Sequence, residues 1–297
     1  MFTGLSAFPL TPFKDEHIDF TAFEKLISNL VDAKVDSIGA LGSTGLYPYL
    51  KTEEIKSVAQ KTVEFAAGTP VMAGIGALRT IDVLKNAQAV QEAGVNAVLL
   101  APMSYHRMQE DEVFELYQQV TANLSVPLCV YENPGTTNFT FSDELYRDVT
   151  RLPHVAAIKI PGMPFATEQG HQRLTELRKI VPEHVAIGVS GDKFGAKGMA
   201  AGCDLWLSVL GGLFPHTVKA FIEKAATLQQ CLPEQAQNQY ETLWGLFVKY
   251  KGGLRVMATA ANILGFVEGN GLPAPLKPMN KEDRDILATL ITQLDLK

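Results

Sequence analysis

The chain has 297 residues, of which 46% are hydrophobic and 20% are charged, and its formal net charge is −6. A chain of this length buries a large core without disulfide staples. Its acidic balance and lack of a basic block argue against nucleic acid or an anionic membrane surface as a partner. The three cysteines, Cys129, Cys203 and Cys231, are far apart and form no CxxC pair, so no disulfide or zinc framework is predicted.

The sequence also lacks the common signals for membranes and metals. No window reaches the run of about 18 apolar residues that indicates a membrane span, and the N-terminus has no charged segment followed by an apolar one. We therefore expect a cytoplasmic protein. The six histidines show neither HxH nor HExxH spacing, so no metal site is expected.

Eight short apolar runs alternate with amphipathic stretches along the chain. They span residues 5–9, 37–41, 70–74, 97–101, 128–131, 155–160, 185–189 and 205–209. Apolar runs without in/out alternation are typical of parallel strands that helices cover. Eight such strands in regular alternation with helices predict a (β/α)8 barrel rather than an open doubly wound sheet.

The stretches between and after these strands show the apolar spacing of amphipathic helices. The helices read from this spacing span residues 52–65, 111–124, 214–228, 233–250, 254–264 and 281–294. The third of them would close the barrel, and no low-complexity linker follows it. We therefore expect a barrel over residues 1–228 and a C-terminal helical extension over residues 229–297 that packs on it.

Lys159 is the strongest candidate for chemistry, because the active site of such a barrel lies at the carboxyl ends of the strands. It lies inside the apolar strand 155–160, where a desolvated interior disfavours the charged ammonium. A neutral amine can attack a carbonyl group and form a Schiff base. The structural alternative is a lysine at an edge or one that snorkels out at a strand end.

Tyr131 closes the preceding predicted strand. A phenol beside an amine could carry the protons that imine formation and C–C cleavage require. The alternative is a core tyrosine with one satisfied hydroxyl.

The sequence Gly42-Ser43-Thr44-Gly45 follows the second predicted strand. Small residues there let backbone N–H groups and two hydroxyls face a carboxylate. Alone the motif is weak, because clusters of glycine, serine and threonine also make ordinary turns.

In combination these motifs resemble the dihydrodipicolinate synthase/N-acetylneuraminate lyase family. The chain has GSTG after strand two, Tyr-x-x-Pro-Gly from Tyr131, and Lys-Ile-Pro-Gly from Lys159. The resemblance covers essentially the whole chain, from Phe8-Pro9-Leu10-Thr11-Pro12-Phe13 through Ser190-Gly191-Asp192 to the C-terminal helices. It implies a homo-oligomeric class I aldolase, a dimer or tetramer, that acts on pyruvate or another 2-oxo acid. No cofactor is implied, because the lysine itself supplies the electron sink.

The resemblance also implies roles for individual residues. Lys159 matches the Schiff-base lysine, Tyr131 the catalytic tyrosine and Ser43 the hydroxyl of the proton relay. The residues expected to bind the keto acid are Thr44, which holds its carboxylate, and Gly191 and Leu207, whose backbone carbonyls line the pocket.

Three positions depart from the family pattern. Thr136 stands where synthases usually place an arginine for the second substrate's carboxylate, and Leu46 replaces the carboxylate that usually ends the GSTG motif. Tyr105 lies one residue beyond the tyrosine that the family lends across a subunit interface. Without the arginine, Thr136 and Thr137 could instead bind hydroxyls. This favours a sugar-acid type of aldehyde partner over aspartate semialdehyde.

Other functions stay open at this point. Synthase activity on aspartate semialdehyde is one alternative, and dehydration or deamination of a keto acid through the same imine is another. The same barrel could also be a binding protein without catalysis, since a fold does not determine a function. Gly211-Gly212 after strand eight could form a phosphate loop, but the lysine–tyrosine pair would then have no role.

Overall fold

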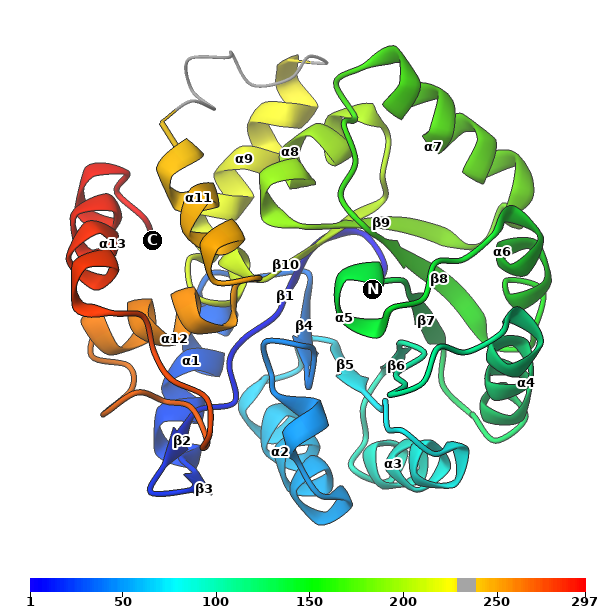
Figure 1. The fold of residues 1–297 in the computed structure, drawn as a ribbon, viewed down its shortest axis with the longest axis horizontal. Coiled ribbons are helices and arrows are strands. Elements are labelled where there is room, and N and C mark those ends of the chain that lie inside the picture. Colours follow the sequence, from blue (N-terminus) through cyan, green and yellow to red (C-terminus); the bar gives the residue numbers. More distant parts are fainter. Residues whose placement is uncertain (229–238) are drawn as a thin grey trace.

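The computed structural model describes residues 1–228 and 239–297, and among them eight parallel strands form a closed barrel inside a ring of helices (Figure 1). The strands are β1 Gly4–Ala7, β4 Ser37–Ala40, β5 Val71–Gly74, β6 Ala97–Leu100, β7 Leu128–Tyr131, β8 Val155–Ile160, β9 Ala186–Ser190 and β10 Leu205–Ser208. Strand β1 closes the barrel between β10 and β4. The predicted (β/α)8 barrel is confirmed, as are all eight predicted strands, whose ends differ by two residues at most.

The connecting helices cover the outside of the barrel. They are α1 Phe20–Asp32, α2 Thr52–Phe65, α3 Thr80–Glu92, α4 Glu110–Thr121, α6 Asp143–Val149, α7 Glu168–Ile180, α8 Asp192–Ala201 and α9 Pro215–Leu228. Helix α2 has the predicted bounds. The helix predicted at 111–124 begins at Glu110, because Gln109 and Glu112 form a capping box there. The sequence did not predict the short β2 Phe13–Lys14, β3 His17–Ile18 or α5 Pro134–Thr137.

Three more helices follow the barrel: α11 Glu241–Lys249, α12 Leu254–Ile263 and α13 Lys281–Gln293. The chain end is tied to α9, where Thr217 N donates to the Lys297 carbonyl and Lys297 N donates to Thr217 Oγ1, both at 2.9 Å. The start of the helix predicted at 233–250 lies outside the described residues. The division predicted at 228/229 falls at their edge and stays a prediction. Within the described ranges, no helix has the length and hydropathy that a membrane crossing needs.

Side chains alternate between the inside and the outside of the barrel along each strand. In β8, Ile158 and Ile160 belong to the outer core under the helices, whereas Ala157 belongs to the cluster inside the barrel. Lys159 therefore points inward. The ring of Phe8 also lies inside, next to Gly39 and Gly42; a Cβ on either glycine would come within 2.4–2.5 Å of that ring. The interior near Lys159 is thus lined by an aromatic ring packed against glycines.

Candidate active site

Lys159 and Tyr131 lie side by side at the carboxyl ends of two neighbouring strands. The register pairs Tyr131 of β7 with Lys159 of β8, and both side chains face the barrel interior. Lys159 is 4% exposed and Tyr131 is 6% exposed. The structure thus brings together the two residues that the sequence predicts to carry the chemistry.

The amine of Lys159 is held by aromatic rings. Its Nζ lies 4.1 Å from the centroid of the Tyr131 ring and 4.2 Å from that of Phe8. It forms no hydrogen bond or ion pair with any residue that the structure describes. Ring faces attract an ammonium, yet they leave the lone pair of the neutral amine free to attack a carbonyl group. Sequence reasoning gave Phe8 no role, although its position at the end of the first strand was a signal.

Tyr131 is surrounded by further polar groups. Its phenol oxygen accepts a hydrogen bond of 2.7 Å from Asn133 Nδ2. Tyr47, on the short 3-10 turn Tyr47–Tyr49, is also buried. Burial is the main cause that raises the pKa of Tyr47, and the charge interaction with Tyr131 raises it further. Neither Asn133 nor Tyr47 was singled out from the sequence.

The GSTG segment follows β4 at the same end of the barrel. Ser43 is exposed and Thr44 is buried, and the Leu46 N–H donates to the Ser43 carbonyl across the turn. Leu46 itself is fully buried in the outer core with φ +61°. An apolar leucine suits this place, because a carboxylate there would need buried partners.

Leu207 lies on β10, and Gly191 directly follows the end of β9. Leu207 faces the interior from β10, and Gly191 turns the chain from β9 into α8 with φ +84°.

Beside Gly191 is the half-buried Asp192. Its Oδ1 accepts from Ser208 Oγ at 2.5 Å, and its Oδ2 accepts from the Leu210 N–H at 3.1 Å. Burial raises the pKa of Asp192, while these hydrogen bonds and the charge of Lys159 oppose the rise. Asp192 therefore ties α8 to β10 and places a carboxyl group near the amine.

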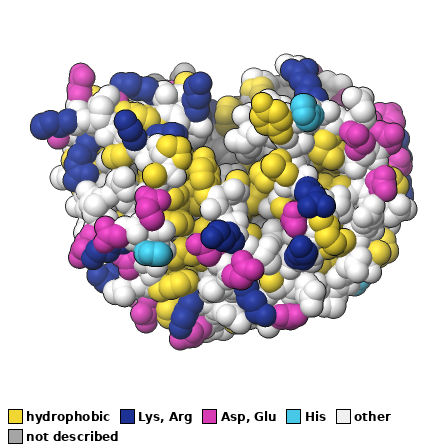
Figure 2. Space-filling model, turned by 60° about the horizontal axis from the view of Figure 1, so that its bottom comes forward, with side chains coloured by type: hydrophobic (Ala, Val, Ile, Leu, Met, Phe, Trp, Pro, Cys, Tyr) yellow, Lys and Arg dark blue, Asp and Glu magenta, His cyan; other side chains and the backbone are white. Residues whose placement is uncertain are grey.

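The two remaining predicted residues lie at the surface. Thr136 is exposed on α5, and its Oγ1 donates to the Asn133 carbonyl at 3.4 Å. Tyr105 is 88% exposed and contacts His106 edge to face. It lines a surface cavity of about 500 Å³ together with Leu78, Arg107 and other residues. Figure 2 shows one face of the molecule, hollowed at its upper edge, with hydrophobic side chains interspersed among charged ones.

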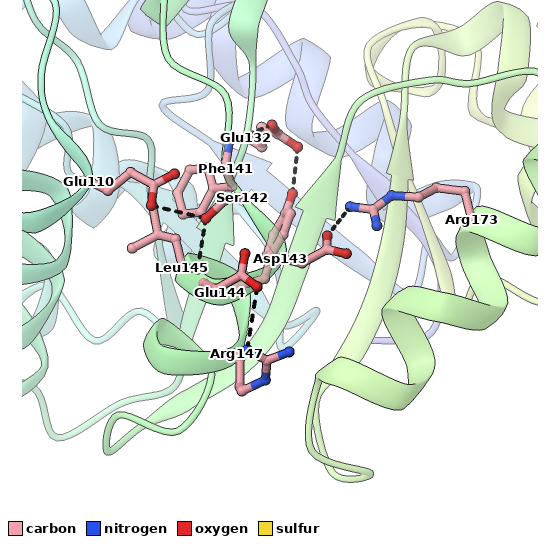
Figure 3. A network of polar contacts seen from close by, with 10 residues as sticks. Glu110, Glu132, Phe141, Ser142, Asp143, Glu144, Leu145, Arg147 and Arg173 are labelled. Carbon is pink, nitrogen blue, oxygen red and sulfur yellow. Dashed lines mark hydrogen bonds and ion pairs between the residues drawn. The ribbon is translucent and has the colours of Figure 1, made fainter.

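A second polar cluster joins Glu132, which directly follows β7, to α6 and to the chain before that helix (Figure 3). Glu132, 6% exposed, accepts from the Phe141 N–H at 2.9 Å and from Tyr146 Oη at 2.5 Å. Burial raises the pKa of Glu132, and its two hydrogen bonds and the charge of Arg173 act against the rise. This cluster was not predicted from the sequence.

Comparison with known proteins places the chain and its fold in one family. The model of the dihydrodipicolinate synthetase family matches residues 1–294. The chain is 26% identical to an enzyme of Rickettsia typhi named 4-hydroxy-tetrahydrodipicolinate synthase, and the match covers all of this chain and 99% of that one. It is 28% identical to an enzyme of the same name from Chloroherpeton thalassium, and that match covers 99% of this chain and 96% of that one. The crystal structure of dihydrodipicolinate synthase from Agrobacterium tumefaciens is 36% identical, with a TM-score of 0.88 over 99% of this chain and 98% of that one. The chain therefore belongs to the dihydrodipicolinate synthetase family of aldolase-type lyases, which act on pyruvate through a lysine Schiff base.

Proposed function

We propose that Lys159 forms the Schiff base with pyruvate and that the aldehyde partner is hydroxylated and uncharged, such as the aldehyde that a substrate of the sugar-acid type releases together with pyruvate. The observation that carries the first part is the buried Nζ between two rings, without an ionic partner in the described residues. Neutral Nζ attacks C2 of the keto acid to form a carbinolamine, whose hydroxyl takes up a proton delivered through Tyr131 and leaves as water, which gives the protonated imine. Loss of a C3 proton then yields an enamine that adds to the aldehyde, and the reverse sequence cleaves the product.

The other predicted residues take supporting roles in this proposal. Tyr131 carries protons to and from the reacting oxygen, and Ser43 continues the relay. Thr44 holds the carboxylate of the keto acid, and the carbonyls of Gly191 and Leu207 line the pocket. The burial of Thr44 and Leu207 and the positive φ of Gly191 support this assignment.

Thr136 supports the choice of an uncharged aldehyde. It is exposed where a synthase would carry its arginine, and a hydroxyl there offers no bidentate pair to a carboxylate. Thr137 is buried whereas Thr136 is exposed, which leaves Thr136 as the candidate contact.

The names of the curated relatives favour a second candidate, 4-hydroxy-tetrahydrodipicolinate synthase. The two functions separate in one assay in which the purified protein receives pyruvate with either glyceraldehyde or aspartate semialdehyde. Faster consumption of pyruvate with glyceraldehyde supports the main proposal. Efficient condensation with aspartate semialdehyde alone would replace it with the second candidate.

The assembly proposed is a homo-oligomer, a dimer or tetramer. The exposed Tyr105 and Leu78, which line one surface cavity, support it, because contiguous exposed apolar groups mark contact surfaces. Light scattering on the purified chain measures the mass, and a monomer at micromolar concentration would contradict this part. The cytoplasmic location expected from the sequence stays a prediction.

A further inference from the structure

The hydrogen bond between Asn133 and Tyr131 fixes where the phenol proton points. Asn133 Nδ2 lies 2.7 Å from the Tyr131 oxygen, and an amide nitrogen donates hydrogen bonds but does not accept them. The phenol proton must therefore point away from Asn133. We propose that Asn133 is a positioning residue for proton transfer, which keeps the Tyr131 proton available to the imine and stabilises the oxygen once the proton has left. This rests on the proposed role of Tyr131.

Hydrogen bonds hold the backbone of Asn133, so that its side chain stays directed at the Tyr131 oxygen. Its carbonyl accepts hydrogen bonds from the N–H groups of Thr136 and Thr137, both at 3.0 Å. Pro134 follows directly and restricts the backbone of the residue before it. A side-chain substitution at Asn133 leaves these backbone bonds in place, so it tests the amide itself.

Glu132 holds the same segment from the other side. Its N–H donates to the Lys159 carbonyl at 3.0 Å, while its buried carboxyl group accepts from Phe141 and Tyr146 (Figure 3). The residue between Tyr131 and Asn133 is thereby tied to the strand of the reactive lysine and to the chain beyond α5.

The surroundings explain why a donor is needed. Tyr131 is 6% exposed, so little water reaches its ring. In the described part of the chain, Asn133 is the one hydrogen-bond partner recorded for the phenol oxygen. Negative charge that develops on a buried oxygen is costly without a donor, and a hydrogen bond to it becomes stronger as the charge grows.

The test uses the half-reaction with pyruvate alone, which needs no aldehyde. Incorporation of solvent deuterium into the methyl group of pyruvate, followed by NMR, reports formation of the imine and enamine. The variants are Asn133→Ala, Asn133→Asp, Tyr131→Phe and the double variant Tyr131→Phe/Asn133→Ala. Asn123→Ala is the matched control, because the Asn123 amide donates to the Gln119 carbonyl on the exposed surface of α4.

We expect Asn133→Ala to lower the exchange rate at saturating pyruvate by about 10- to 100-fold, the range for a hydrogen bond to a charged group. The half-saturating pyruvate concentration and the melting temperature should match those of Asn123→Ala. Asn133→Asp should be at least as slow as Asn133→Ala, because its carboxylate accepts the phenol proton and repels the developing charge. In the Tyr131→Phe background, Asn133→Ala should cost less than about twofold.

Two results would overturn the inference. If Asn133→Asp keeps more activity than Asn133→Ala, the side chain only shapes the loop. If Asn133→Ala costs the same factor with and without the phenol, it does not act through Tyr131. A wild-type protein that exchanges no deuterium would instead overturn the proposed function, and with it the role of Tyr131 on which the inference depends.

Discussion

Two buried ionisable side chains on neighbouring strands have opposite surroundings. Lys159 points into the barrel from β8, and Glu132 follows β7 on the side of α6. Each oxygen of Glu132 accepts a hydrogen bond, one from Phe141 and one from Tyr146. Nζ of Lys159 meets aromatic rings, and no residue in ranges 1–228 and 239–297 accepts a hydrogen bond from it.

The hydrogen-bonded carboxyl group of Glu132 stabilises the structure, whereas the amine of Lys159 is free to react. A buried charge is tolerated when its hydrogen-bonding capacity is met, and then its loss leaves buried partners unpaired. An amine without such partners is held less firmly but keeps its lone pair for a carbonyl carbon. Removal of Glu132 should therefore cost mainly stability, and removal of Lys159 mainly activity.

Replacement of the lysine should have the largest effect. Lys159→Arg and Lys159→Ala should give no reduced adduct when pyruvate and borohydride are added, because arginine does not deprotonate in proteins and alanine has no amine. The mass of the intact protein measures the adduct, and Lys193→Arg, at an exposed position of α8, is the control. Turnover within about tenfold of wild type in Lys159→Arg would refute the assignment.

Loss of the phenol should come next. Tyr131→Phe keeps the ring against Nζ and removes the hydroxyl, so the rate should fall by about 10²- to 10⁴-fold with the fold intact. A melting curve and a rate measured on the same sample decide the matter. A loss of about 1 kcal/mol in stability with an unchanged rate would mark Tyr131 as a core residue only.

Loss of the carboxyl group tests the structural half of the comparison. Glu132→Ala should lower the free energy of unfolding by about 2–6 kcal/mol, since two buried donors lose their partner at about 1–3 kcal/mol each. Denaturant titration measures it. Glu144→Ala is the control: this exposed side chain pairs with Arg147 at 3.9 Å, and its loss should cost less than about 0.5 kcal/mol. Equal losses in the two variants would contradict the role given to Glu132.

A guanidinium at the mouth of the site should change the choice of aldehyde. Thr136→Arg should raise the preference for an anionic over a neutral aldehyde by up to about 1.5–3 kcal/mol, as a hydrogen bond to a charged group can. The ratio of the two kcat/KM values, in wild type and variant, measures this preference. An unchanged ratio would show that position 136 faces solvent away from the substrate.

The smallest expected effect is a difference in pH dependence. Burial raises the pKa of Glu132 above its ordinary value of 4.5, so the folded protein keeps this proton after the unfolded chain has lost it. Wild type should therefore lose stability relative to Glu132→Gln as pH rises from about 4.5 through the raised pKa. Other carboxyl groups with a raised pKa, such as the half-buried Asp192, are shared by both proteins and cancel. A stability difference that is flat over this range, or grows in favour of wild type, would reverse the direction given for this pKa.

The sequence predicts most of the barrel and the centre of its site for a simple reason. The runs 128–131 and 155–160 are apolar and end sharply, so their bounds agree with β7 and β8. Parallel pairing then places the ends of both strands at one edge, with Tyr131 opposite Lys159. Local pattern and topology are enough for this pair.

The rest depends on contacts that no local pattern contains. Phe8 reaches Lys159 because β1 closes the barrel, and Asn133 reaches the phenol through the turn at Pro134. Glu132 is a charged residue next to a strand end, which usually indicates exposure to solvent; the structure buries it because Tyr146 is there to donate. Such side-chain pairings require coordinates.

The packing of Phe8 has a consequence for the history of this chain. Because its ring occupies the space in which a Cβ on Gly39 or Gly42 would lie, these three positions form one steric unit. A larger side chain at position 39 or 42 can be accepted only after a smaller residue has replaced Phe8. The substitution at position 8 must therefore come first. Among relatives, a small residue at position 8 should accompany larger residues at 39 or 42, and an aromatic one should accompany glycine. An alignment sorted by the residue at position 8 would reveal whether the family divides along this line.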